Sequence, residues 1–101
     1  MFCYNVKINI DADKADEWLK WMKEKHIPDV MKTGYFNSYK IFRSADKTGN
    51  EKKIDFLIQY WFGSMENYLN YLENDAKLLQ KEHTEKFAGK FTASREIWEE
   101  I

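Results

Sequence analysis

The sequence has few of the residues that cross-link or break a chain. Its 101 residues include one cysteine, one proline and four glycines. The single cysteine, Cys3, excludes an internal disulfide, and with two distant histidines it does not form the Cys/His spacing of a structural zinc site. We therefore expect no bound metal, and we interpret Cys3 as a small buried strand residue rather than a nucleophile.

The sequence also lacks an excess of charge of either sign and has no long apolar run. Sixteen basic and seventeen acidic side chains leave a net charge of −1, which indicates neither nucleic acid nor an anionic membrane as a partner. No apolar run approaches the roughly 20 residues of a membrane-spanning helix. The first ten residues, MFCYNVKINI, alternate in polarity and do not resemble a signal peptide. We expect a cytoplasmic protein.

Apolar side chains, in contrast, are plentiful. Hydrophobic residues make up 44% of the chain and aromatic residues 17%, enough to build a folded core. The length suits one such core, and no linker or low-complexity stretch divides the sequence. We expect a single domain over residues 1–101.

Two hydrophobic periods alternate along the chain. A period of two predicts strands over residues 2–10, 35–43, 53–62 and 91–98, with a turn around Thr48, Gly49 and Asn50. Spacings of three and four predict a helix after Asp11 and another after Ser64. The inward stripe of the first is Ala15, Trp18, Leu19, Met22 and His26, and that of the second is Met65, Tyr68, Leu69, Leu72, Ala76, Leu79 and His83. Pro28 is expected to break the first helix, and Asn74 and Asp75 to bend the second.

The order strand, helix, strand, strand, helix, strand predicts a ferredoxin-like α+β sandwich: a four-stranded antiparallel sheet with two helices on one face. At its centre we expect the first and third strands as a side-by-side, parallel pair. That pair would make the two helices parallel to each other. Their C-termini, and with them His26 and His83, would then share one end of the domain.

The two faces of the predicted sheet differ in polarity. The helix-covered face is apolar, whereas the opposite face is mixed and carries Asn5, Lys7, Leu57, Gln59 and Trp61. Exposing Leu57 and Trp61 to water is unfavourable, so we expect a second copy of the chain to cover them as a homodimer, the dimeric α+β barrel. The alternative is a solvated face in a monomer.

Four segments resemble a known family: W-L-K-W-M-K-E-K-H-I-P-D-V over residues 18–30, T-G-Y-F over 33–36, Q-Y-W-F over 59–62, and His83-x3-Phe87-Ala-Gly-Lys-Phe91. Together they resemble the uncharacterised domain-of-unknown-function family 4286, within the dimeric α+β barrel group. The resemblance covers nearly the whole chain. It implies the fold but no activity, catalytic residue, cofactor or ligand.

The two histidines are the candidate catalytic residues. An imidazole titrates near neutral pH, so His26 and His83 lining one pocket, with Asp29 or Tyr35, could transfer protons or orient a polar ligand. The alternative is that each histidine caps the terminal carbonyls of its helix.

Our leading hypothesis is that a small apolar or aromatic molecule binds between sheet and helices, without a cofactor. The expected binding residues are Trp18, Met22, His26, Asp29, Tyr35, Tyr68, Tyr71 and His83. One alternative is a monooxygenase-like or isomerase-like enzyme of the barrel group using His26 or His83. For haem-degrading relatives, the resemblance implies Asn5, Tyr71 and His83, although Asn5 lies on the opposite sheet face. Another alternative is a structural or interaction module without a ligand.

Overall fold

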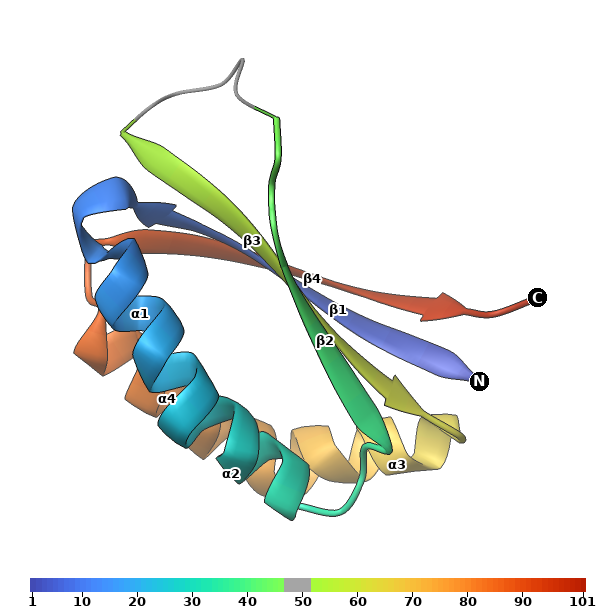
Figure 1. Ribbon diagram of the computed structural model, residues 1–101. Coiled ribbons are helices and arrows are strands. Elements are labelled where there is room, and N and C mark those ends of the chain that lie inside the picture. Colours follow the sequence, from blue (N-terminus) through green and yellow to red (C-terminus); the bar gives the residue numbers. More distant parts are fainter. Residues whose placement is uncertain (47–51) are drawn as a thin grey trace.

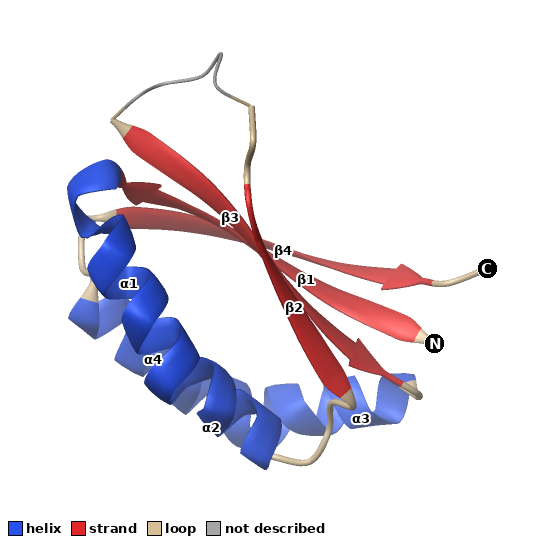
Figure 2. Cartoon of the chain, in the orientation of Figure 1, coloured by secondary structure: helices blue, strands red, loops and turns tan. Residues whose placement is uncertain are grey.

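The computed structural model describes residues 1–46 and 52–101, and it consists of one sheet with helices on one face (Figures 1 and 2). The strands are β1 (Phe2–Asp11), β2 (Ser38–Arg43), β3 (Lys53–Phe62) and β4 (Phe91–Glu99), in the spatial order β2-β3-β1-β4. The first helical segment contains η1 (Ala12–Lys14), α1 (Ala15–Trp21), η2 (Met22–His26) and α2 (Ile27–Lys32). The second contains α3 (Met65–Tyr71), η3 (Leu72–Ala76) and α4 (Lys77–Lys86). The predicted ferredoxin-like fold is confirmed.

The strand limits agree closely with the alternating patterns, except that β2 begins at Ser38 and not at residue 35. Gly34, with a φ of +83°, and Phe36, which is buried, belong instead to the connection that leads out of α2. A positive φ is costly for residues other than glycine, so Gly34 ends the helix where predicted. The predicted turn at Thr48, Gly49 and Asn50 lies outside the described residues.

All three neighbouring strand pairs are antiparallel, including β1 with β3, in which Val6 faces Ile58. Our expectation of a parallel pair at the centre is therefore wrong. The β2–β3 hairpin reverses the chain between the two helical crossovers, so β3 runs opposite to both β1 and β2. The parallel strands joined by a right-handed crossover are β1 and β2, with β3 inserted between them.

The two helical segments consequently run antiparallel, and the expected common C-terminal end is also wrong. The start of the first segment meets the end of the second: Trp18 on α1 contacts His83 on α4. His26 lies in the middle of the first segment and still comes close to His83, with ring centroids 5.6 Å apart. The two histidines thus meet, for a different reason from the one that we expected.

Each helical segment contains a π-helical turn. In the first, η2, the Ile27 N–H donates to the Met22 carbonyl five residues back, directly before Pro28. Proline has no N–H to donate and disturbs the preceding turn, so Pro28 widens the helix rather than breaking it. The second π turn, η3, includes the predicted bend at Asn74 and Asp75. π turns are frequent at functional sites, and His26 is the last residue of η2.

The core lies between the helices and the even-numbered residues of β1 and β3. Tyr4, Ile10, Ile58 and Phe62 are each at most 2% exposed and pack against Trp18 and neighbouring helix residues. Part of the predicted stripe of the second helix is wrong, because Met65, Leu69 and Leu72 are exposed. Its inward face is formed by Tyr68, Tyr71, Ala76, Leu79 and His83, together with Phe87.

No described helix combines the length and hydropathy needed to cross a membrane. The cytoplasmic location stays a prediction.

Candidate functional site

The candidate site lies between the sheet and the two helical segments, where both imidazoles enter an aromatic core. His83 on α4 is 6% exposed and is the one polar or charged residue in the buried core of the described chain. The rings of Trp21 and Phe87 contact it from the helices, and the Phe91 ring from β4 lies 4.4 Å away, centroid to centroid. Burial in such surroundings disfavours a charged imidazole.

A hydrogen bond fixes the orientation of His83. The indole Nε1–H of Trp18 donates to His83 Nε2 over 2.8 Å, in a fully buried position. An indole nitrogen is only a donor, so Nε2 must be the unprotonated nitrogen and the neutral ring carries its proton on Nδ1. Because Nε2 accepts this bond, it does not cap a helix carbonyl, and the capping interpretation stays an alternative only for Nδ1 of His83.

His26 is the unsatisfied member of the pair. Its Nδ1 is buried and has no hydrogen-bond partner among the described residues. The ring packs against Trp21, with centroids 5.3 Å apart, and against His83. Buried polar atoms nearly always have a partner, and leaving one unpaired costs roughly 1–3 kcal/mol. An unpaired imidazole nitrogen is therefore the strongest indication of function in the site.

Both imidazoles are neutral at physiological pH. Burial lowers the pKa of His26 to about 4, with Asp29 opposing that shift and Arg95 and Lys25 adding to it. Burial also lowers the pKa of His83 to about 4, and the neighbouring charges of His26 and Arg95 act in the same direction. A neutral imidazole can accept a hydrogen bond on one nitrogen and donate on the other.

A small cavity of about 30 Å³ joins the two histidines to the sheet. Apolar side chains and three tyrosines, Tyr4, Tyr60 and Tyr71, form its wall, and Gln80 and Arg95 add polar groups. Burial raises the pKa of all three tyrosines, so their hydroxyls stay protonated and act as neutral donors and acceptors. In this closed arrangement the space suits about one water molecule.

Gln80 and Arg95 are the more solvated polar groups of the cavity. Gln80 on α4 is partly buried and Arg95 on β4 is exposed. Hydrogen bonds from both side chains act on the Tyr4 hydroxyl and lower its pKa against the larger effect of burial. These two long side chains therefore form the mouth of the cavity.

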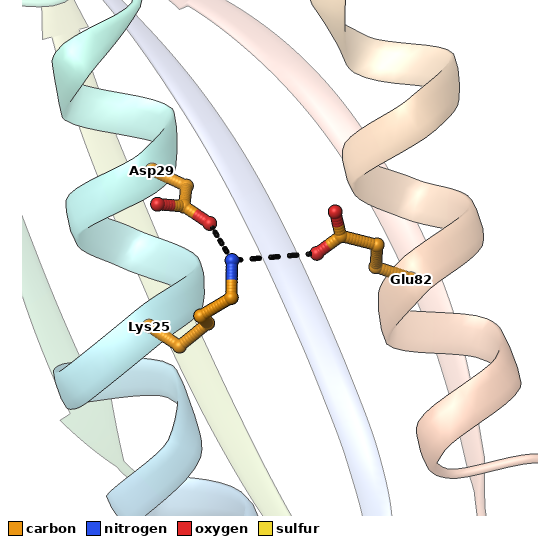
Figure 3. Close-up of polar contacts among 3 residues, drawn as sticks. All are labelled: Lys25, Asp29 and Glu82. Carbon is orange, nitrogen blue, oxygen red and sulfur yellow. Dashed lines mark hydrogen bonds and ion pairs between the residues drawn. The ribbon is translucent and has the colours of Figure 1, made fainter.

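A charged cluster of Lys25, Asp29 and Glu82 links the two helical segments (Figure 3). Lys25, which precedes His26, pairs with Asp29 on its own helix and lies 3.7 Å from Glu82, which precedes His83. Figure 3 shows the ammonium group between the two carboxylates. The cluster thus joins the two helical segments through residues that neighbour His26 and His83 in sequence.

The structure brings five of the eight predicted binding residues together. Met22, His26, Tyr71 and His83 line the cavity, and Trp18 supports His83 from behind. Three others lie elsewhere. Asp29 joins the charged cluster, the Tyr35 hydroxyl lies 3.5 Å from Asn74, and Tyr68 packs against Tyr4 and Phe62.

Eight of the twelve lining residues were not among the predicted binding residues, and four of these eight carry polar groups: Tyr4, Tyr60, Gln80 and Arg95. Tyr4 and Tyr60 alternate with the other helix-facing residues of β1 and β3, so their parity was available as a signal. Arg95 falls in the same parity as Ala93 and Ile97 of β4, where a cation is unexpected. A cation among the apolar positions of this strand face was the feature of the sequence that could have indicated the mouth of the cavity.

The residues implied by haem-degrading relatives do not assemble. Asn5 lies on the opposite side of the sheet from the cavity, where its side chain accepts a hydrogen bond from Cys3 Sγ over 2.9 Å. Tyr71 and His83 line the cavity, but His83 Nε2 is held by Trp18. Within residues 1–46 and 52–101, no cluster of three His, Cys, Asp or Glu side chains is arranged to hold a metal ion.

The fold and this buried polar cluster define a ferredoxin-like α+β protein with a cavity between its layers. The chain belongs to the family described as Domain of unknown function (DUF4286), whose model matches residues 1–101. The resemblance proposed from the sequence is thereby confirmed. No curated protein matches the chain.

Solved structures of similar fold include enzymes. A putative antibiotic biosynthesis monooxygenase from Nitrosomonas europaea superimposes with a TM-score of 0.69 at 13% identity, covering 100% of this chain and 99% of that one. A dimeric ferredoxin-like protein from an uncultured marine organism gives 0.72 at 14% identity, covering 100% and 95%. SnoaB, a cofactor-independent oxygenase from Streptomyces nogalater, gives 0.69 at 12% identity, covering 99% and 93%. At such identities the similarity extends to the fold alone.

Proposed function

We propose that the chain binds a small aromatic molecule carrying a hydroxyl group, in the cavity between sheet and helices. The observation that carries this proposal is the buried, unpaired Nδ1 of His26. In the neutral tautomer with its proton on Nε2, this nitrogen accepts a hydrogen bond from the hydroxyl. The aromatic wall matches the ordinary composition of ligand pockets, which are mostly apolar with a few placed polar groups.

Entry of such a molecule requires the mouth to open. The closed cavity of about 30 Å³ is far below the roughly 300 Å³ at which ligand pockets begin. Gln80 and Arg95 are long side chains at its edge, and Arg95 is exposed, so both can swing outward at low cost. The ring then replaces their stems against Tyr4 and Tyr71.

The experiment compares 4-methylphenol with 4-methylanisole, which has the same ring but no hydroxyl proton. Backbone amide shifts in NMR titrations yield both affinities for the wild type and for His26→Leu. We expect the phenol to bind about fivefold more tightly to the wild type, the equivalent of one hydrogen bond, and equally to the variant. Equal affinities in the wild type, or no binding at millimolar concentration, would contradict the proposal.

Proton abstraction by His26 is a second candidate function, favoured by the same unpaired and neutral nitrogen. Among proteins of similar fold, the oxygenase SnoaB is cofactor-independent. However, a general base works best with a pKa near the operating pH, and the pKa of His26 is about 4. Binding therefore ranks above catalysis. Consumption of the phenol under air, lost in His26→Leu, would reverse that order.

We also propose that the chain forms a homodimer through the open face of its sheet. There Trp98 is 58% and Phe42 47% exposed, and Leu57 and Trp61 are partly buried. A hollow of about 540 Å³, lined in part by Phe42 and Leu57, lies on this side. The face carries both signs of charge, since Lys7 pairs with Glu96, so two copies can meet without net repulsion.

Sedimentation of Trp61→Glu tests the dimer, because an unpaired charge buried at the interface should dissociate it. Tyr39→Glu is the matched control, since Tyr39 lies on an outer strand, is 40% exposed and shares the helix-facing parity of Tyr60. We expect a dimer for the wild type and for Tyr39→Glu, and a monomer for Trp61→Glu. A monomeric wild type would overturn this arrangement.

A further inference from the structure

Arg95 has an unusual position for a surface arginine. It lies in the middle of β4, opposite Val6 of β1, on the face of the sheet that packs against the helices. Its strand neighbours on that face are Ala93 and Ile97, both packed against the core. A cation placed there is surrounded by apolar and aromatic side chains on the protein side.

Arg95 also has no carboxylate partner in the described part of the chain. Within residues 1–46 and 52–101 its guanidinium forms no ion pair, whereas Lys7, Lys25 and Lys53 each pair with an acid. The polar group that it contacts in the cavity is the neutral hydroxyl of Tyr4. No Asp or Glu lines the cavity, so its positive charge has no acidic partner in the cavity wall.

The other polar residues that line the cavity carry no negative charge, and the nearest carboxylates that act on its wall, Asp29 and Asp75, are not among the lining residues. His26 and His83 are neutral at pH 7, and the tyrosine hydroxyls of the wall are protonated. Gln80 is the remaining polar side chain at the mouth. An arginine fork offers paired N–H donors that match a carboxylate, and such charge-assisted bonds are about twice as strong as neutral ones.

From this arrangement we infer that the ligand is an aromatic anion, whose carboxylate binds Arg95 at the mouth while its hydroxyl reaches His26 inside. The inference deepens the proposed binding site and rests on it. The ring would lie between the two polar ends, along the wall that Tyr4 and Tyr71 form. A para-hydroxybenzoate is the simplest molecule with this pattern.

Titration of 4-hydroxybenzoate and 4-hydroxybenzamide by NMR tests the inference, because the two differ chiefly in charge. We expect the acid to bind the wild type at least about tenfold more tightly than the amide, as a charge-assisted pair requires. Arg95→Gln should remove this preference and leave the affinity for the amide within about twofold. Arg95→Lys should retain part of it, since a lysine keeps the charge but not the fork.

The outcomes separate the two proposals. If both compounds bind equally and Arg95→Gln alters neither, the charge preference is wrong and the phenol site survives. If neither compound binds while 4-methylphenol does, the anion inference is again wrong. If none of the three binds at millimolar concentration, the site itself is refuted. Exposed Lys90→Gln serves as the control for general loss of positive charge, and we expect it to change neither affinity.

Discussion

The indole of Trp18 donates its single N–H to Nε2 of His83, across 65 residues of sequence and 2.8 Å of space. Both side chains are buried, so water does not compete for this hydrogen bond. It ties the start of the first helical segment to the end of the second and leaves His83 with a protonated Nδ1. For Nδ1 of His26, beside it, the described residues offer no such partner.

Substitution by leucine should affect folding stability differently at the two histidines. His83→Leu leaves the Trp18 N–H buried and unpaired, and we expect a loss of roughly 1–3 kcal/mol of folding stability. His26→Leu removes an unpaired polar atom and should be neutral or stabilising within about 1 kcal/mol. Urea denaturation measures both. Similar losses at the two positions would mean that His26 has a partner after all.

Removing the Trp18 indole N–H, the donor of this hydrogen bond, should also lower the folding stability. Trp18 is fully buried, so Trp18→Phe leaves a cavity and frees His83 Nε2, and we expect a loss of about 2–4 kcal/mol. The pKa of His83 should also rise, because its Nε2 is no longer occupied. NMR titration of the imidazole protons follows this change. An unaltered His83 pKa in a folded variant would contradict the assigned tautomer.

Acid should destabilise the protein before its carboxylates titrate. A histidine has a pKa of 6.5 when unperturbed and about 4 here, so the unfolded chain binds protons first. The stability that the neutral histidines contribute is fully present above pH 6.5, and it is lost as the pH decreases towards 4. For His83 the shift corresponds to roughly 3 kcal/mol.

His83→Gln is the control for the effect of acid, because its amide oxygen still accepts from Trp18 and does not titrate. Urea midpoints between pH 7.5 and pH 4, in decrements of about half a unit, should fall less steeply for this variant. Identical slopes for wild type and variant would show that His83 is not held neutral.

The charged cluster between the helices should contribute little. Lys25, Asp29 and Glu82 are partly or largely exposed, and exposed pairs are screened by salt. We expect Lys25→Met to lower the urea midpoint slightly at low salt and not at about 1 M salt. Lys81→Met, which removes the more exposed pair with Glu85 at 3.9 Å, should have a smaller effect. A large, salt-independent loss for Lys25→Met would assign the cluster a structural role.

The strands were predictable because each has one buried face, and alternation in β1 and β3 matches that face residue by residue. The predicted direction of β3 is wrong, since hydrophobic periods carry no information about direction, whereas the β2–β3 hairpin makes β3 antiparallel to both β1 and β2. The inward stripe of the second helix was wrong at Met65, Leu69 and Leu72 because the π turn at η3 shifts the helical phase.

At the site, helical spacing predicted that His26 and His83 both face inward, but the expected direction of the helices, which was to bring them together, was wrong. Arg95 was missed although its strand parity was a signal. Periodicity indicates which positions face the core, but a charged residue at such a position counts as an exception until its surroundings are known. Asp29 and Tyr35 were chosen for their chemistry and their proximity in sequence. Asp29 instead pairs with Lys25 on its own helix, and Tyr35 lies beyond the end of α2 with its hydroxyl 3.5 Å from Asn74.

The state of His26 in the presence of a phenol tests the central claim most directly. The chain contains two histidines, so nitrogen-15 spectra of the imidazoles are assigned by His26→Leu alone. At pH 7 we predict an unprotonated Nδ1 in His26 whose resonance moves when 4-methylphenol is added, while the His83 nitrogens stay unchanged. A His26 spectrum unaffected by saturating phenol, or a proton on its Nδ1, would contradict the account.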